Sequence, residues 1–260
     1  MIFLKLGGSL ITNKAIPETP RPDLIRRMAE EIAVFRQQHA DETLLLGHGS
    51  GSFGHHAAST YQTQVGASTP EEWLGFSKVW HAAQRLNRLV IDGLHSQGLP
   101  AVTFPPSASA VCQNGRLIEM DADCIRSAFA ANLIPVVHGD VAFDRAIGCT
   151  IISTEEVFTY LAGLFQPTRI LLAGVEPGVY ADASQKTTLL QEIHTFDLER
   201  LSLSGSSDED VTGGMYAKVH EALAMAQACP LAEIYIFSPD TPGALTAALE
   251  GGHPGTRLLA

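Results

Sequence analysis

The chain has 260 residues, of which 45% are hydrophobic and 17% charged, and its formal net charge at pH 7 is −11. This length and composition can bury a large core, either as one α/β domain or as two joined lobes. The acidic balance argues against a nucleic-acid or anionic-membrane partner, since either would require a basic surface.

The four cysteines, Cys112, Cys124, Cys149 and Cys229, contain no C-x-x-C pair. Their spacing resembles neither a metal knuckle nor a disulfide framework, so we expect reduced and mostly buried thiols. The first residues do not follow the pattern of a signal peptide, and no apolar run reaches membrane-spanning length. The sequence therefore predicts a soluble, cytoplasmic protein with no membrane partner.

Short apolar runs alternate with helical patterns along the chain. The predicted strands are Ile2–Leu6, Thr43–Leu46, Ala101–Phe104, Ile134–His138, Arg169–Ala173 and Ile234–Phe237. One predicted helix begins at Pro22 and Asp23, and a second covers about Glu71 to Ser96. This order predicts an α/β fold, an open αβα sandwich with a mostly parallel central sheet, whose ligands lie at the carboxyl ends of the strands.

Smaller features complete the outline. Gly115 lies between two short apolar pairs and predicts a hairpin, and Asp140 to Ile152 predicts another. Ser202 to Asp210 is serine-rich and acidic, which is typical of a mobile surface loop.

Three glycine-rich segments carry the strongest functional signal. Gly47 to His56 holds four glycines and three histidines, directly after a predicted strand. Glycines at such spacing let several backbone N–H groups converge on an anion, and histidine can donate hydrogen bonds to phosphate oxygens. Lys5-Leu6-Gly7-Gly8-Ser9 follows the first strand, and Thr212-Gly213-Gly214-Met215 opens a helix that carries Lys218. Phosphate binding is therefore the first hypothesis.

Two of the segments also have a plainer interpretation. Lys5–Ser9 could be a tight turn with a solvated lysine, and Thr212–Met215 an ordinary helix start with a surface lysine. Lys14, in a loop before two prolines, is by itself most simply solvated. No G-x-x-x-x-G-K-[ST] motif occurs, which excludes a Walker A loop.

Several other polar residues are weaker candidates. Asp140, Asp144, Glu155 and Glu156 are possible metal ligands or lysine partners, although such carboxylates are most often only solvated. His48, directly after the strand, is expected to hydrogen-bond to the backbone, and His56 to face solvent.

Taken together, the three segments resemble those of the amino acid kinase superfamily and, within it, the isopentenyl phosphate kinases. The most specific element is His-Gly-x-Gly-Ser-Phe-Gly-His, here His48 to His55. The resemblance covers nearly the whole chain, up to a final strand that begins at Gly255-Thr256. It implies ATP-dependent phosphorylation of isopentenyl phosphate for isoprenoid biosynthesis, with Mg²⁺, in a homodimer. It also implies an acceptor-binding lobe at 1–165 and a nucleotide-binding lobe at 166–260.

The resemblance also implies site residues. The catalytic residues would be His55, Lys14 and Lys5. The nucleotide would contact Lys5, Gly7, Gly8, Ser9, Gly51, Gly214 and Lys218. The acceptor would contact Ser50, Gly54, His55 and Thr154, next to an apolar slot whose wall we expect from Trp73, Phe76, Val79, Trp80 and Ala83.

The chain departs from the family pattern in two places. It has Ser153-Thr154-Glu155 where the family commonly has Ser-Gly-Asp, and Gly174–Tyr180 differs from the family's nucleotide loop. Two other functions stay open. A fosfomycin kinase shares the last histidine of the motif but would need a polar pocket, and a non-catalytic nucleotide sensor would bind ATP without releasing ADP.

Overall fold

The computed structural model describes residues 1–182, 186–197 and 213–260. The predicted Ser202–Asp210 loop and Thr212 lie outside these residues. The helices are α1 Gly8–Ile11, α2 Pro22–Gln38, α3 Gly51–Tyr61, α4 Pro70–Ser96, α5 Asp123–Ala130, α6 Thr154–Phe165, α8 Gly213–Ala228 and α9 Ala244–Leu249. Short 3-10 turns are η1 Thr63–Val65, η2 Pro106–Ala108 and η3 Thr195–Asp197.

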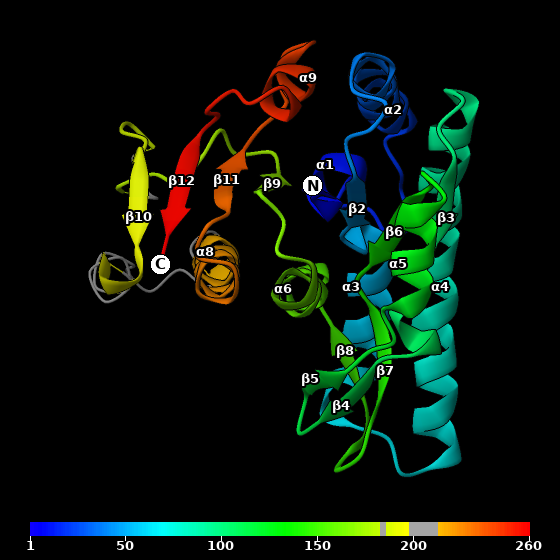
Figure 1. Ribbon diagram of the computed structural model, residues 1–260. Helices are drawn as coiled ribbons and strands as arrows, with labels where there is room; N and C mark the ends of the chain where they lie inside the picture. The colour runs from blue at the N-terminus through cyan, green and yellow to red at the C-terminus, as the bar shows by residue number, and fades with distance from the viewer. Residues whose placement is uncertain (183–185, 198–212) are drawn as a thin grey trace.

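An eight-stranded sheet in the order β10-β12-β11-β9-β1-β2-β6-β3 runs through the molecule (Figure 1). Its strands are β1 Ile2–Leu6, β2 Leu44–His48, β3 Ala101–Thr103, β6 Ile134–His138, β9 Arg169–Ala173, β10 Glu192–His194, β11 Glu233–Phe237 and β12 Thr256–Leu259. Neighbouring strands are parallel except for β11 and β12. The predicted mostly parallel αβα sandwich is confirmed.

A second sheet in the order β5-β4-β7-β8 lies beside the main one. It consists of the two predicted hairpins, β4 Val111–Gln113 with β5 Arg116–Glu119, and β7 Asp140–Asp144 with β8 Gly148–Ile152. Asp144 holds these turns together, because its carboxylate accepts hydrogen bonds from the N–H groups of Gly115 and Ala146 at 2.7 and 2.8 Å.

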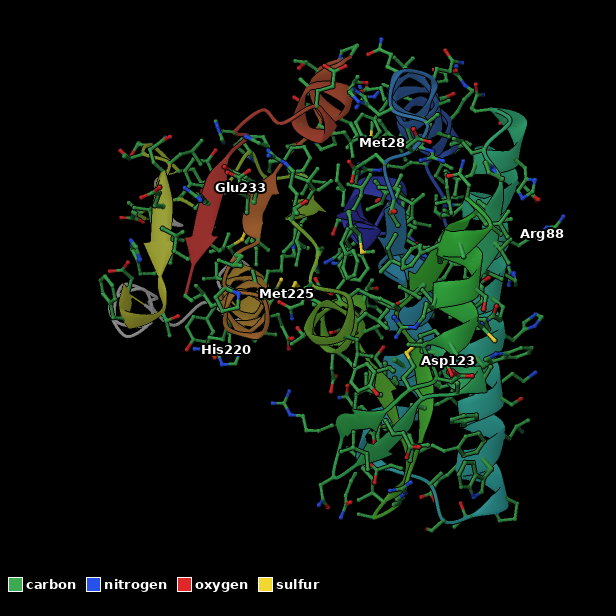
Figure 2. All side chains as sticks on the ribbon, viewed as in Figure 1. Met28, Arg88, Asp123, His220, Met225 and Glu233 are labelled. Atoms are coloured by element: carbon green, nitrogen blue, oxygen red, sulfur yellow. The ribbon has the colours of Figure 1, made fainter. Side chains whose placement is uncertain are left out.

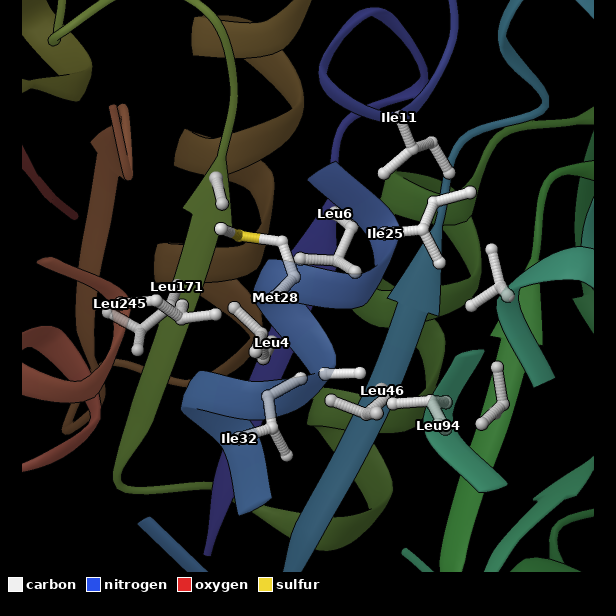
Figure 3. Packing of buried hydrophobic residues seen from close by; sticks show 14 of the residues in the cluster. Leu4, Leu6, Ile11, Ile25, Met28, Ile32, Leu46, Leu94, Leu171 and Leu245 are labelled. Carbon is white, nitrogen blue, oxygen red and sulfur yellow. The ribbon is translucent and has the colours of Figure 1, made fainter. Parts of the chain in front are cut away.

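Alternation along β1 divides the core between the two faces of the main sheet. Leu4 and Leu6 pack on one side with α2, α4 and α9, as Figure 3 shows for Met28, Ile32 and Leu245. On the other side, Phe3 packs against α6 and α8. By the same alternation, Lys5, the last residue but one of β1, lies on the α6 side of the sheet near its carboxyl edge.

Helix α4 begins with a complete capping box, which fixes its start at the predicted position. The Thr69 hydroxyl accepts from the Glu72 N–H at 3.3 Å, and the Glu72 carboxylate accepts from the Thr69 N–H at 2.8 Å. None of the helices in the described ranges has the length and hydropathy that crossing a bilayer requires. All four cysteines are free, and only Cys124 is exposed.

Candidate active site

The carboxyl edge of the main sheet is marked by four glycines. Gly7, Gly49, Gly139 and Gly174 directly follow β1, β2, β6 and β9. Each donates its N–H to the carbonyl of the last residue of a neighbouring strand, at 2.7–3.2 Å. The chain therefore turns away from four adjacent strands at the same level, which leaves a depression above the edge, as expected for an open α/β sheet.

Two helices begin directly at this edge and approach each other through glycine backbone. A Cβ atom on Gly8 of α1 would lie 2.5 Å from the Gly51 nitrogen of α3. Gly51 has φ +51°, and a Cβ there would lie 2.3 Å from the Thr12 Oγ1 atom. Neither position can hold a larger residue without displacing backbone. The sequence predicts a glycine-rich loop from His48 to His55, but β2 extends to His48, and His55 lies on α3.

The depression is a cavity of about 410 Å³. All of the predicted site residues except Gly51 line it: Lys5, Gly7, Gly8, Ser9, Lys14, Ser50, Gly54, His55, Thr154, Gly214 and Lys218. Gly51 lies behind the cavity, beside Thr12 and a second hollow bounded by Lys14 and His56.

Lys5 is held by Glu155 at the start of α6. Their side chains form an ion pair and are only 8% and 13% exposed. Burial raises the pKa of the Glu155 carboxyl, but the charge of Lys5 and its hydrogen bond more than offset this, and the net shift is downward. Glu155 is therefore ionised, and it fixes the Lys5 ammonium at the base of the cavity.

Lys14, Lys218 and His55 surround the same space. Burial lowers the pKa of Lys218, and the charges of Lys5 and Lys14 lower it further. Desolvation likewise lowers the pKa of His55, and Lys14 is the next largest cause. These mutual effects show positive groups close together in an acidic protein, an arrangement that an anionic ligand would stabilise.

Two buried histidines support the edge from below. His48 and His138 are register partners on β2 and β6, and their rings stack with centroids 5.2 Å apart. Each ring Nδ1 lies within 3.2 Å of the carbonyl oxygen of the following glycine, and Asn87 on α4 contacts His48 Nε2 at 3.2 Å. Burial lowers the pKa of His48 to about 3 and of His138 to about 4, so both are neutral. The prediction that His48 is structural is confirmed.

Thr154, which is predicted to contact the acceptor, also has a structural role. It lines the cavity, but its hydroxyl donates to the carbonyl of His48 at 2.6 Å. The hydroxyl proton of Thr154 is therefore used in a hydrogen bond that joins α6 to β2. In this chain the residue that replaces the family's glycine ties two elements of the site together.

The apolar part of the cavity is lined by aliphatic side chains and not by the predicted aromatic rings. Ala58, Val79, Ala83 and Ile151 line it. Trp73 and Phe76 pack on Phe143 of β7 instead, with ring centroids 5.9 and 5.1 Å away. Trp80 is 42% exposed on the outer side of α4. Of the five predicted wall residues of α4, Val79 and Ala83 line the cavity. The prediction was wrong for Trp73, Phe76 and Trp80, because α4 turns those rings toward the hairpin and toward solvent.

The carboxylates named as possible metal ligands or lysine partners have distinct roles, and the lysine-partner prediction is confirmed for Glu155. Glu155 pairs with Lys5, Asp144 caps hairpin turns, and Glu156 accepts from the Leu117 N–H at 2.8 Å. Within the described ranges, no group of three or more His, Cys, Asp or Glu side chains could hold a metal ion.

Sequence reasoning missed several cavity residues. Gly49, Gly139 and Gly174 carried a usable signal, since each follows an apolar run that ends a strand. Asp140 was named as a possible metal ligand or lysine partner and not as a cavity residue, yet it lines the cavity, and burial raises its pKa to about 6. Gln64 and Val175 gave no signal, because their position depends on how η1 and the segment after β9 pack.

A parallel α/β sheet with clustered lysines and glycine-rich helix starts defines a phosphate-binding class of protein. Comparison with known proteins agrees with this class and narrows it. The sequence profile of the Amino acid kinase family matches residues 1–238. The chain belongs to this family.

Curated relatives extend the similarity along the chain. It is 34% identical to an isopentenyl phosphate kinase of Methanothermobacter thermautotrophicus, with 99% of this chain and 98% of that protein covered. It is 31% identical to an isopentenyl phosphate kinase of Haloferax volcanii, with 98% and 97% covered. A solved structure described as X-ray structures of isopentenyl phosphate kinase superposes with a TM-score of 0.83 at 32% identity, covering 99% of each chain.

Proposed function

We propose that this protein transfers the γ-phosphoryl group of ATP to isopentenyl phosphate, which yields isopentenyl diphosphate for isoprenoid biosynthesis. One observation carries the proposal: a single cavity combines Lys5, Lys14, Lys218 and His55 with an apolar wall from Ala58, Val79, Ala83 and Ile151. The cationic part suits two phosphate groups, and the apolar part suits a short hydrocarbon tail. The curated relatives named isopentenyl phosphate kinase support the same reaction.

The acceptor in this reaction does not need a general base. A phosphate monoester has a second pKa of about 6, so near neutral pH it is mostly a dianion. The site must overcome repulsion between two anions and stabilise the charge of the transferring group. Positioning and electrostatics therefore supply the rate enhancement.

The cavity residues divide between the two ligands. We assign the ATP phosphates to Lys5 and Lys218 and to the backbone of Gly7, Gly8, Ser9 and Gly214, which lie on the side of β1 and α8. We assign the acceptor phosphate to His55, Ser50 and Gly54 on the side of α3. Lys14 lines the same cavity and would neutralise the negative charge of the phosphoryl group during its transfer.

Magnesium fits this assignment as a companion of the nucleotide. Mg²⁺ keeps several waters and is usually bound through substrate phosphates with one or two carboxylates. The described residues contain no preformed cage for it, and Glu155 is already engaged by Lys5. Bound to the triphosphate, the ion would neutralise charge, while the lysines set the position of the phosphates.

The proposed lobes share one sheet. Residues 1–165 would bind the acceptor and residues 166–260 the nucleotide, yet β1 pairs with β2 on one side and with β9 on the other. The boundary therefore passes along a continuous hydrogen-bonded ladder. Because one hydrogen-bonded sheet continues through both lobes, we expect the two proposed binding sites to keep a fixed position relative to each other.

We propose that the protein works as a cytoplasmic homodimer. Leu74, Trp80 and Leu89 leave apolar surface exposed along α4, and Val102 does so on the edge strand β3, which contacts this helix. Four free thiols suit a reducing compartment. Light scattering after size exclusion would test the dimer, and a monomeric mass at micromolar concentration would contradict it.

A coupled ADP-release assay tests the reaction. Isopentenyl phosphate and dimethylallyl phosphate should support turnover with ATP and Mg²⁺, whereas fosfomycin and uridylate should support little. Fosfomycin as the preferred acceptor would identify the other kinase activity, and ATP binding without ADP release would identify a sensor. The apolar wall disfavours the first of these alternatives, since fosfomycin is small and polar.

A further inference from the structure

Helix α4 reaches the loop that carries Lys14. The Arg85 Nη1 atom of α4 lies 2.7 Å from the Glu18 Oε2 atom, and the two side chains are 48% and 37% exposed. Glu18 is four residues beyond Lys14, in the segment between α1 and α2. Arg85 does not line the cavity, so this ion pair is outside the site described above.

The loop is fixed at its base but not at Lys14. Asn13 donates its N–H to the Thr19 carbonyl at 2.8 Å, and the Thr19 N–H donates to the Ser52 hydroxyl at 3.1 Å. Lys14 itself is exposed, and within the part of the chain that the structure describes it makes no ion pair. The position of its ammonium group therefore depends on the backbone around it.

Glu18 is held in an uncommon conformation. Its φ is +49°, in the left-handed region that non-glycine residues rarely adopt. Such a residue persists where its surroundings fix it. Here its N–H donates to the Ser52 carbonyl at 3.3 Å, and its carboxylate pairs with Arg85.

Arg85 also contacts the helix that carries His55. Its Cζ atom lies 5.7 Å from the ring centroid of Phe53, which is buried in the core two residues before His55. Helices α3 and α4 lie side by side along this contact (Figure 1). One guanidinium group thus touches the loop of Lys14 and the helix of His55 at the same time.

We infer that Arg85 is a positioning residue that holds the Lys14 loop at a fixed distance from His55, and so places the Lys14 ammonium for phosphoryl transfer. This inference rests on the proposed function. An exposed ion pair contributes little to global stability. A small displacement of the Lys14 ammonium group, in contrast, should lower the rate of phosphoryl transfer strongly. The Arg85–Glu18 pair should therefore matter more for turnover than for folding.

The test compares Arg85→Gln and Glu18→Gln with a control on the same helix. Arg88→Gln removes an exposed arginine that pairs with Asp92 at 2.9 Å and points away from the molecule (Figure 2). Arg85→Gln should lose roughly 3- to 30-fold in kcat, the range set by one exposed ion pair and one cation–π contact, and Glu18→Gln, which removes the ion pair alone, should lose less. KM for isopentenyl phosphate and the Tm should change little. Arg88→Gln should behave as wild type.

Three further readouts separate positioning from general damage. Arg85→Lys should recover part of kcat, because it keeps the charge opposite Glu18. Combining Arg85→Gln with Glu18→Gln should cost less than the product of the single losses, since both remove one contact. Added salt should lower wild-type kcat toward that of Arg85→Gln and affect the variant less.

Limited trypsin digestion examines the loop without any substrate. Cleavage after Lys14 should be faster in Arg85→Gln than in wild type or Arg88→Gln. Equal cleavage rates, or a kcat equal to that of Arg88→Gln, would overturn the inference, as would a loss of kcat that follows a large drop in Tm. Wild-type turnover of isopentenyl phosphate in the same series decides the proposed function separately.

Discussion

Lys5 and Glu155 are 150 residues apart in the chain, and their side chains form an ion pair beneath the cavity. β1 contributes the lysine and the first turn of α6 the carboxylate. The pair therefore joins the start of the chain to the helix that follows the second hairpin. Its consequences for stability and for catalysis can be tested separately.

Replacing Glu155 should destabilise the protein. Glu155→Gln would leave the Lys5 charge buried without its partner, and breaking a buried pair on one side costs about 3–5 kcal/mol. Glu119→Gln, which removes an exposed pair with Arg145, should cost less than about 1 kcal/mol. Urea denaturation of both variants measures the difference. Similar stabilities would mean that the Lys5 pair contributes no more than a surface pair.

His55 should contribute to the rate directly. His55→Ala removes the proposed donor to the acceptor phosphate, and we expect a loss of roughly 100-fold or more in kcat, the usual effect of one well-placed donor. His56→Ala is the matched control, because the neighbouring imidazole is exposed and does not line the main cavity. Near-normal turnover by His55→Ala would remove this residue from the mechanism.

The pKa of His55 should respond in opposite directions to two substitutions. Desolvation lowers it most and Lys14 next, whereas Glu155 raises it. Lys14→Met should therefore raise the pKa, and Glu155→Gln should lower it. NMR titration of the imidazole C2 proton, assigned by its loss in His55→Gln, measures both shifts. No upward shift in Lys14→Met would show that the ammonium lies too far away to act on the acceptor site.

Acid should destabilise the protein through His48 and His138. Their folded-state pKa values, about 3 and about 4, lie below the ordinary 6.5. Their contribution is complete above pH 6.5 and is lost as the pH falls toward 4, because the unfolded chain then binds protons that the folded chain does not. For each histidine, the unfolding free energy should fall by about 1.4 kcal/mol for every unit by which the pH is lowered in this window. Denaturation at pH 7, 6 and 5 should show a shallower slope for His138→Gln, and an unchanged slope would contradict the assignment.

Local patterns predicted the elements that position this site. The apolar runs placed β1, β6 and β9 correctly, and the glycines after β1 and β2 predicted a phosphate-binding edge because parallel strands end at one level. The direction of side chains on α4 was not predictable in the same way. Trp73 and Val79 both follow the helical period, but which of them faces the cavity depends on where Phe143 of β7 packs.

The same limit explains the polar residues. The ion pair of Lys5 with Glu155 and the contact of Arg85 with Glu18 both join segments that are distant in sequence. The sequence shows which charged residues are present. Which of them form ion pairs depends on how α4 and α6 pack in the folded chain. The family resemblance predicts which residues are catalytic, and the fold shows which side chains they contact.

The apolar wall should set the length of the prenyl tail. Val79 is buried and lines the cavity, so Val79→Ala would remove two methyl groups from the wall and lengthen the space beyond the acceptor phosphate. Geranyl phosphate should then gain in kcat/KM relative to isopentenyl phosphate. We expect a change of about 10- to 100-fold in this ratio, since each buried methylene is worth about 0.8 kcal/mol and a longer tail buries several.

Trp80→Ala provides the control for this prediction. Trp80 is on the adjacent position of α4 and is larger than Val79, but it points outward, so its removal should leave the preference for tail length unchanged. Ala83→Val should act in the opposite direction to Val79→Ala, raising KM for isopentenyl phosphate with a smaller effect on kcat, because it narrows the slot without touching the phosphates. Competition assays with isopentenyl, dimethylallyl and geranyl phosphates give the three ratios. A preference that changes in Trp80→Ala and not in Val79→Ala would place the tail on the other side of the helix.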